Sequence, residues 1–474
     1  MMILRQPRYN ATRRVKTLNT ADIAAYIDAN RDEFMAQLFE FLRIPSISTD
    51  PVYADDVRRC ANWLVDHLED IGMQTVELHD TEGHPVVYAE WLSEKEDAPT
   101  LLLYGHYDVQ PPDPLDEWET APFDPTIRDG KIYARGATDD KGQLFAHLKA
   151  LDAWLSTVGE LPINFKVLLE GEEEVGSAHL PAFIAENKEK LAADAVVISD
   201  SPMFAKGVPS IVYGLRGLAY LEMTVRGASH DLHSGLFGGA VPNPINELSK
   251  IVAALHDESG RVTIPGFYDN IVPLDDEERR AFAELPFDEE EFQRESGVPK
   301  LVGEEGYTTL ERIWARPTLD CNGIWGGFTG EGAKTVLPAR AHAKFSCRLV
   351  ANQDPDDIAK KAQDWVAELA SDAVEVEVRV FHGGPPVLTD RDNPTVRAAC
   401  RALTRVWDEE AVFTRGGGSI PVVATFSEVL EVPTVLMGFG LDDDRLHSPN
   451  EKFNVENFYA GIRAAAFLLE EAAR

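Results

Sequence analysis

Residues 101–110, LLLYGHYDVQ, decide the fold expected for this chain. The run Leu101–Leu103 is typical of a strand buried on both faces of a parallel sheet. The run stops at Gly105, and His106 and Asp108 follow two residues apart. Ligand sites of α/β enzymes lie just beyond the carboxyl ends of such strands. His106 is therefore a candidate metal ligand, with Asp108 orienting it through the second ring nitrogen or through water. A solvated strand-end turn is the alternative.

Apolar strands and amphipathic helices alternate on both sides of this stretch, up to about residue 213. We expect helices at 20–43, 55–71, 141–157 and 178–190, and strands at 74–79, 85–91, 163–170 and 195–199. Such alternation predicts an α/β layer with a largely parallel sheet.

The pattern changes between residues 214 and 385. LAYLEMTVRG, AHAKFSCRLV and VEVEVRVF each alternate apolar and polar residues, and helices are expected at 244–256 and 354–371. Alternating strands beside helices predict a small α+β domain with an antiparallel sheet. The acidic segment 274–295 is expected to be a solvated surface helix. The α/β pattern returns from 386 to 474, so we expect a discontinuous domain, 1–213 with 386–474, and an inserted domain, 214–385.

Composition excludes several classes of partner. The chain has 474 residues, and its 80 acidic against 45 basic residues give a formal charge of −35, which argues against nucleic acid or an anionic membrane. None of the four cysteines stands in a C-x-x-C pair, so a thiolate zinc site is not indicated and a cytoplasmic protein with reduced cysteines is expected. The N-terminus lacks the apolar region of a signal peptide, and no apolar run is long enough to span a membrane.

Further polar loops follow other apolar segments. They contain Asp139-Asp140 in GATDDKG, 172–174 in EGEEEVGS, Asp200 in ISDSP, His233 in DLHSG and His447 in LHSPNE. Four of these loops alone have a simpler explanation: a helix cap for the aspartate pair, a solvated charge run for the glutamates, a turn for Asp200 and a core histidine for His447. Their recurrence at strand ends favours a metal site, and histidine with carboxylate but no cysteine suits zinc, with manganese or cobalt as alternatives.

Seven motifs in order, GHYDVQP, RGATDDKG, EGEEEVGS, DLHSGLFGG, GAKTVLP, GGGSIP and HSPNEKF, resemble those of the di-metal peptidase and deacylase superfamily. The branch of carnosinases and cytosolic nonspecific dipeptidases is the most similar. The resemblance implies an α/β catalytic domain with a mostly parallel sheet, an inserted α+β lid and dimerisation domain, and two divalent ions per subunit. Gly416 departs from the branch, which has glutamate there, and Ala134 replaces a glycine; the first difference concerns substrate preference.

The resemblance also implies a role for individual residues. The implied metal ligands are His106, Asp139, Glu174, Asp200 and His447, with Asp139 bridging both ions. Glu173 would be the general base and Asp108 the residue that orients His106. His233, from a neighbouring subunit, would stabilise the oxyanion. The implied substrate contacts are Arg348, which would hold the substrate carboxylate, together with Thr335, His382 and Ser419.

The function expected on these grounds is metal-dependent hydrolysis of dipeptides or short peptides with a free C-terminal carboxylate, by a cytoplasmic homodimer. A deacylase or desuccinylase of N-acyl amino acids with the same metal centre is the alternative. A catalytically inactive metal-bearing scaffold is a third hypothesis. The sequence speaks against it, because Glu173 and all five implied ligands are present.

Overall fold

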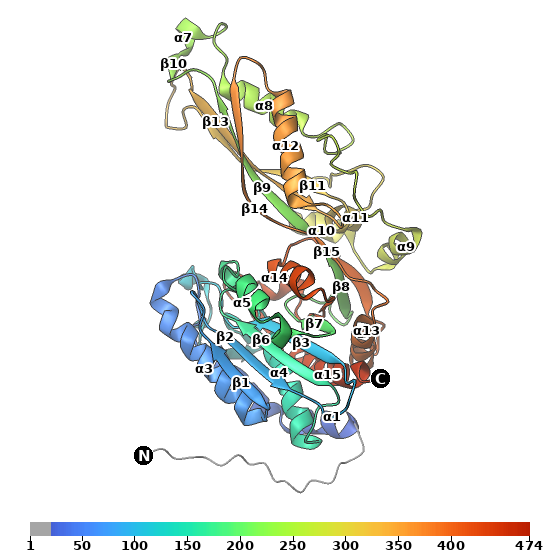
Figure 1. Cartoon of the computed structure of the whole chain (residues 1–474). Helices are drawn as coiled ribbons and strands as arrows, with labels where there is room; N and C mark the ends of the chain where they lie inside the picture. The colour runs from blue at the N-terminus through green and yellow to red at the C-terminus, as the bar shows by residue number, and fades with distance from the viewer. Residues whose placement is uncertain (1–19) are drawn as a thin grey trace. The chain divides into compact units, whose positions relative to one another are not determined.

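A computed structural model describes residues 20–474, which form parts of two compact units (Figure 1). Unit 1 contains the chain up to Tyr213, Thr389–Thr414 and Pro421–Arg474. Unit 2 contains Gly214–Leu388 and Arg415–Ile420. The N-terminal stretch used for the signal-peptide prediction lies outside the described residues. Within residues 20–474, no helix is both long and apolar enough to cross a membrane.

The sheet of unit 1 is parallel at its centre and antiparallel at its ends. Its strands follow the order β1 (Thr75–His79), β2 (Val86–Trp91), β6 (Asn164–Glu170), β3 (Thr100–His106), β7 (Ala195–Ile198), β17 (Thr434–Leu436) and β8 (Ser210–Leu215). The strand β3 pairs in parallel with β6 and β7, and β17 pairs in parallel with β7. The α/β prediction is confirmed. Antiparallel pairing occurs toward the two ends of the sheet, between β1 and β2, β2 and β6, and β17 and β8, and β8 also pairs antiparallel with the short strand Val387–Leu388.

Helices of unit 1 enclose a core that contains many aromatic side chains. They are α1 (Thr20–Ala29), α2 (Arg31–Leu42), α3 (Ala54–Ile71), α4 (Lys141–Thr157), α5 (Leu180–Glu186), α6 (Lys188–Leu191), α13 (Pro394–Trp407), α14 (Pro421–Thr425) and α15 (Val455–Ala472). The predicted bounds of α4 are confirmed. The single helix predicted at 20–43 is wrong, because the chain breaks at Asn30, whose side-chain amide donates to the carbonyl of Tyr26 at 2.7 Å. A three-stranded sheet, β18 (Lys452–Asn454), β5 (Lys131–Tyr133) and β4 (Thr126–Arg128), completes the unit.

Unit 2 contains a four-stranded antiparallel sheet. Its strands lie in the order β11 (Thr318–Gly326), β13 (Arg340–Leu349), β9 (Gly217–Arg226) and β14 (Glu375–Gly384). Alternate residues of β9 are buried, and α8 (Pro244–Ala254) and α12 (Pro355–Leu369) pack against the sheet over a second apolar core. This arrangement confirms the predicted antiparallel α+β fold of the insert.

The remaining elements of unit 2 are short. They are β10 (Leu232–His233), α7 (Ser234–Phe237), α9 (Asp276–Glu284), α10 (Glu289–Ser296), α11 (Thr309–Trp314), β12 (Val336–Leu337) and β15 (Val387–Leu388), while β16 (Val412–Gly416) begins in unit 1. The single acidic helix predicted at 274–295 is wrong. Pro286 disfavours helical backbone at Leu285, and Asp288 caps a new helix by accepting the amide N–H of Glu291 at 2.9 Å.

Candidate metal centre

The strand β3 ends at His106, whose ring is completely buried. Its Nδ1 lies 3.1 Å from the main-chain oxygen of Asp108 and 3.4 Å from Oδ1 of the same residue. When the ring is neutral, these acceptors place its proton on Nδ1 and leave the lone pair on Nε2. Nε2 has no hydrogen-bond partner, although Oδ1 of Asp139 is 3.1 Å away and Oδ2 of Asp200 is 3.8 Å away. A buried, unpartnered imidazole nitrogen beside two carboxylates fits a divalent metal ligand.

A second group of ligand atoms shares Asp139 with the first. Oδ2 of Asp139 lies 2.9 Å from Nε2 of His447, which is 3.3 Å from Oε2 of Glu174. The ligand atoms of His106, Asp139 and Asp200 all lie within 4.8 Å of one another, and so do those of Asp139, Glu174 and His447. One carboxylate oxygen of Asp139 therefore faces each group. The five residues implied as metal ligands come together in unit 1, although they span 341 positions (447 − 106).

The segment that carries Asp139 is held by Glu451, a completely buried residue. Oε1 of Glu451 accepts the amide N–H groups of Thr138 at 2.9 Å and Asp139 at 3.1 Å. Its Oε2 accepts the N–H of Gly136 at 3.0 Å and Nη1 of buried Arg135 at 2.7 Å. Glu451 follows His447 by four residues, so one carboxylate ties the two segments together. Sequence reasoning assigned it no role, although it stands in the quoted motif HSPNEKF.

The simpler explanations of two of these segments are wrong. Asp140 occupies the position before α4, yet no side-chain capping bond is made there; its Oδ2 accepts the N–H of His106 at 3.3 Å. The glutamates at 172–174 are not a solvated charge run. Glu172 is buried beside Nδ1 of His179 at 2.9 Å, and the Glu174 side chain is only 3% exposed.

Glu173 and Glu174 lie on a short 3₁₀ turn, Glu173–Val175, which begins three residues after the end of β6. Their main-chain N–H groups donate to Oδ1 and Oδ2 of Asp108 at 3.2 and 3.1 Å. Nε2 of Gln110 donates to Oε2 of Glu174 at 2.8 Å. Gln110 is a further contact that sequence reasoning missed, although it directly follows the GHYDV stretch.

The histidines and carboxylates of the two ligand groups shift one another's pKa values. Burial, reinforced by the charge of Asp139, raises the pKa of Glu174 to about 8 and that of Asp200 to about 7. The hydrogen bond to Asp139 raises the pKa of His447 to about 9 against the opposing effect of burial. Burial alone would lower the pKa of His106, but Asp108 and Asp139 raise it well above its usual value. At neutral pH the protein therefore binds protons at atoms that also suit a cation.

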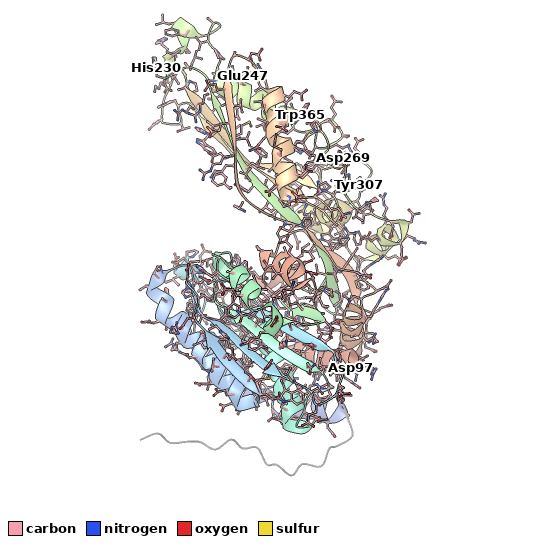
Figure 2. The ribbon with its side chains drawn as sticks, viewed as in Figure 1. Asp97, His230, Glu247, Asp269, Tyr307 and Trp365 are labelled. Carbon is pink, nitrogen blue, oxygen red and sulfur yellow. The ribbon has the colours of Figure 1, made fainter. Side chains whose placement is uncertain are left out.

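The predicted site residues of unit 2 form two groups. His233 pairs with Val336 across β10 and β12, and the N–H of Ser234 donates to the carbonyl of Thr335 at 3.0 Å, so His233 and Thr335 lie close together and exposed. Figure 2 labels His230, three residues before His233, at the exposed end of the unit. Nδ1 of His233 accepts the N–H of Gly235 at 3.0 Å, which places the ring proton on Nε2.

The second group lies at the other end of β9. Nη1 of Arg348 donates to Oγ of Ser419 at 3.2 Å, and Ser419 donates to the carbonyl of Arg216 at 2.5 Å. His382 stacks on Tyr220 of β9, two positions from Leu218, which faces Arg348 in the sheet. Burial and the charge of Arg348 lower the pKa of Arg216 to about 10. Within residues 20–474 neither arginine forms an ion pair, although the charge of Asp320 partly offsets that of Arg216, so the two guanidinium groups suit an anion.

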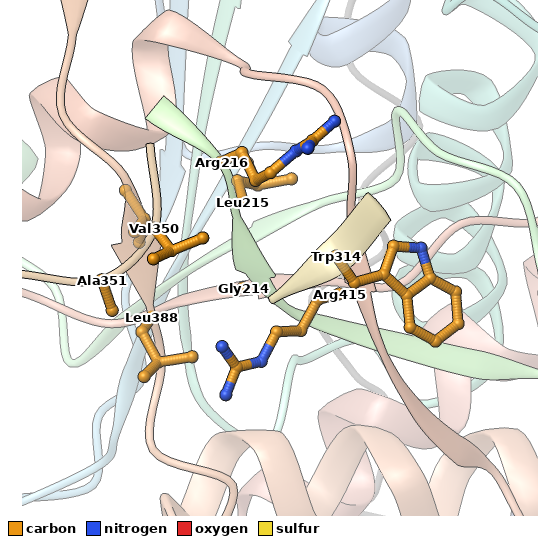
Figure 3. A pocket seen from close by; sticks show the side chains of 9 residues that line it. Gly214, Leu215, Arg216, Trp314, Val350, Ala351, Leu388 and Arg415 are labelled. Carbon is orange, nitrogen blue, oxygen red and sulfur yellow. The ribbon is translucent and has the colours of Figure 1, made fainter. Parts of the chain in front are cut away.

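A small hollow in unit 2 does not serve as a substrate site. It is lined by residues that include Arg216, Trp314, Leu388 and Arg415 (Figure 3). Its volume of about 10 Å³ suits one water molecule rather than a peptide.

Comparison with known proteins agrees with this geometry. Residues 102–471 match the model of peptidase family M20/M25/M40. The chain is 36% identical to the Cys-Gly metallodipeptidase DUG1 of Candida albicans, over 92% of this chain and 94% of the relative. It is 35% identical to the human Beta-Ala-His dipeptidase, over 94% and 92%. Among solved structures, the M20 family metallo-carboxypeptidase Sso-CP2 from Sulfolobus solfataricus is similar, with a TM-score of 0.81 at 36% identity, over 93% of this chain and 99% of that one.

Adding Zn²⁺ to the metal-free protein at neutral pH is expected to release protons. The raised pKa values of Glu174, Asp200 and His447 mean that these groups hold protons which a metal must displace. Calorimetric titration in buffers of different ionisation enthalpy measures the number released. That number should fall as the pH rises through about 8 to 9, because Glu174 and His447 then lose their protons before the metal binds. A binding heat that is independent of the buffer at neutral pH would contradict the assignment, and Asp139→Asn, which removes the shared ligand, is the control.

Proposed function

This chain belongs to peptidase family M20/M25/M40, and we propose that it hydrolyses dipeptides or short peptides with a free C-terminal carboxylate at a two-metal centre. The observation that carries the proposal is the pair of ligand groups that share Asp139. His106 and Asp200 would hold one divalent ion, and Glu174 and His447 the other. Histidine and carboxylate ligands suit zinc, with manganese or cobalt as alternatives. Two such ions would lower the pKa of a bound water and polarise the substrate carbonyl.

Glu173 is the proposed general base. It precedes the ligand Glu174, and its amide is held by the same Asp108 carboxylate. Burial raises the pKa of Glu173, which favours a group that accepts a proton from water and then returns it to the leaving amine. Glu172, the remaining glutamate of the motif, is engaged with His179 and is not assigned this role.

Substrate recognition is assigned to unit 2. The names of the two curated relatives specify Cys-Gly and Beta-Ala-His, dipeptides that differ in their side chains but share a free carboxylate. Arg348, which has no carboxylate partner within the described residues, is the proposed ligand for that group, because a guanidinium binds a carboxylate through paired N–H donors. Ser419, His382 and Thr335 are the further proposed contacts.

The inserted segment 214–385 is the proposed lid and dimerisation domain of a cytoplasmic homodimer, and 1–213 with 386–474 is the proposed catalytic domain. His233 of one subunit would act at the centre of its partner. The exposed Nε2–H of His233 supports this role, since a positioned N–H donor stabilises the charge that develops on the carbonyl oxygen.

Glu173→Gln should reduce kcat by about 10²- to 10⁴-fold, because the amide cannot accept the proton of the attacking water. Metal content should stay unchanged, since Glu173 belongs to neither ligand group. Hydrolysis of a dipeptide and metal analysis on the same sample measure both quantities. Glu172→Gln is the matched control and should keep most of its activity; a Glu173→Gln enzyme with undiminished kcat would refute the assignment of the base.

A substrate panel tests the preference for a free carboxylate. Dipeptides should be hydrolysed far faster than their C-terminal amides, and faster than N-acetyl or N-succinyl amino acids. Arg348→Met should raise KM for the dipeptides by about 10- to 100-fold through loss of charge-assisted hydrogen bonds, and should change KM for the amides little. Arg340→Met, which removes an exposed arginine from the same strand, is the control. Turnover of acyl amino acids alone would instead establish the deacylase function.

Mixing two inactive variants tests whether His233 acts in a neighbouring subunit. His233→Ala and Glu173→Gln should each be inactive as homodimers. In a mixed dimer, the His233→Ala subunit keeps its base and receives an intact His233 from its partner, so roughly a quarter of wild-type activity should return after subunit exchange. His230→Ala is the control for a change at the same exposed end. Absence of any recovery in a sample that contains mixed dimers, or full activity of a strict monomer on sedimentation, would show that His233 does not act in this way.

A further inference from the structure

Ser48 contacts the candidate catalytic centre from outside the family-matched segment. It lies six residues after the end of α2, whereas the family model matches residues 102–471. Its Oγ donates to Oδ2 of Asp108 at 2.6 Å. The sequence motifs give Ser48 no role.

The Asp108 carboxylate does more than face His106. It is completely buried, and its Oδ1 and Oδ2 accept the main-chain N–H groups of Glu173 and Glu174. The nearest acceptor to Nδ1 of His106 is the main-chain oxygen of Asp108, at 3.1 Å, rather than its carboxylate, at 3.4 Å. The carboxylate therefore connects the end of β3 to the turn that carries the proposed base and one ligand, and the Ser48 hydroxyl is its third hydrogen-bond donor.

The segment around Ser48 is itself held in place. Ser46 donates through Oγ to the carbonyl of Tyr107 at 2.5 Å and accepts the N–H of Val109 at 3.0 Å. Nζ of buried Lys141, the first residue of α4, donates to the carbonyl of Ile44 at 2.7 Å. These bonds come from residues next to Asp108 and Asp140, so the Ser48 hydroxyl has a defined position relative to the centre.

Asp108 needs this third donor for a physical reason. A buried carboxylate that loses a donor becomes less well compensated, and it can turn toward another partner. Rotation of the Asp108 side chain would release one of the two amides that it accepts. The turn Glu173–Val175 would then lose its attachment to β3, and with it the position of the Glu173 side chain.

We propose that Ser48 is a positioning residue: through Asp108 it fixes the backbone of Glu173 and Glu174, and so places the general base. The inference rests on the proposed function for the identity of the base. The hydrogen-bonded link itself, Ser48 to Asp108 to the two glutamate amides, does not depend on the substrate.

Ser48→Ala should lower kcat by about 5- to 20-fold and leave KM within about twofold, because the serine hydroxyl contacts Asp108, which holds the turn of the base, rather than a proposed metal ligand or substrate contact. Ser48→Thr, which restores a hydroxyl, should recover most of the kcat. Metal content should be unchanged in both. Thr404→Ala is the matched control, since it removes a partly buried hydroxyl of unit 1 that bonds the carbonyl of Cys400 and the N–H of Ala411.

Hydrogen exchange on the metal-free protein gives a readout that is independent of catalysis. A peptide that covers residues 171–176 should exchange its amide protons faster in Ser48→Ala than in the wild type, and at the wild-type rate in Thr404→Ala. Unchanged exchange and unchanged kcat in Ser48→Ala would overturn the inference, as would an equal loss of kcat in Thr404→Ala. If the wild type hydrolyses no dipeptide, the proposed function fails, while faster exchange in Ser48→Ala would still establish the link.

Discussion

The arrangement of unit 1 depends on the repulsion among three buried carboxylates. Asp139 is buried, and Glu174 and Asp200, each grouped with it, have largely buried side chains, so like charges interact there far more strongly than in solution. Two histidines, His106 and His447, offset part of this charge, and protons offset more, as the raised pKa values of Glu174 and Asp200 indicate. A pair of divalent ions would supply more positive charge to this cluster than protons can. The repulsion among the carboxylates is unfavourable in the metal-free protein, and it therefore favours metal binding.

The parallel strands of the unit 1 sheet place His106, the glutamate turn and Asp200 at the same edge of that sheet. In its parallel centre β3, β6 and β7 run in the same direction, so their carboxyl ends meet at the same edge. His106 ends β3, the glutamate turn follows β6 and Asp200 follows β7 by two residues. Asp139 precedes α4, and His447 belongs to a segment that returns late in the chain. Antiparallel strands at the ends of the sheet do not disturb this edge.

Two further carboxylates hold the backbone rather than face the candidate ions. Glu451 accepts three amide N–H groups of the segment that leads to Asp139, and Asp108 accepts those of Glu173 and Glu174. A buried carboxylate with several N–H donors resists displacement, because each lost bond leaves a charge uncompensated. Both residues are therefore as important for the geometry of the centre as the side chains that face it.

The sequence by itself determined the elements and the chemistry of this protein. Apolar runs and helical periodicity predict β3 and α4 because burial repeats with the local geometry of a strand or helix. The polar motifs identify His106, Asp139 and His447 as candidates, and the resemblance of those motifs implies their roles as metal ligands. Tertiary structure alone decided which oxygen of Asp139 faces which histidine, that Asp140 caps nothing through its side chain, and that Ser48 and Glu451 support the centre. Those outcomes depend on side-chain directions and backbone amides brought together from distant segments, and no local pattern of residues records them.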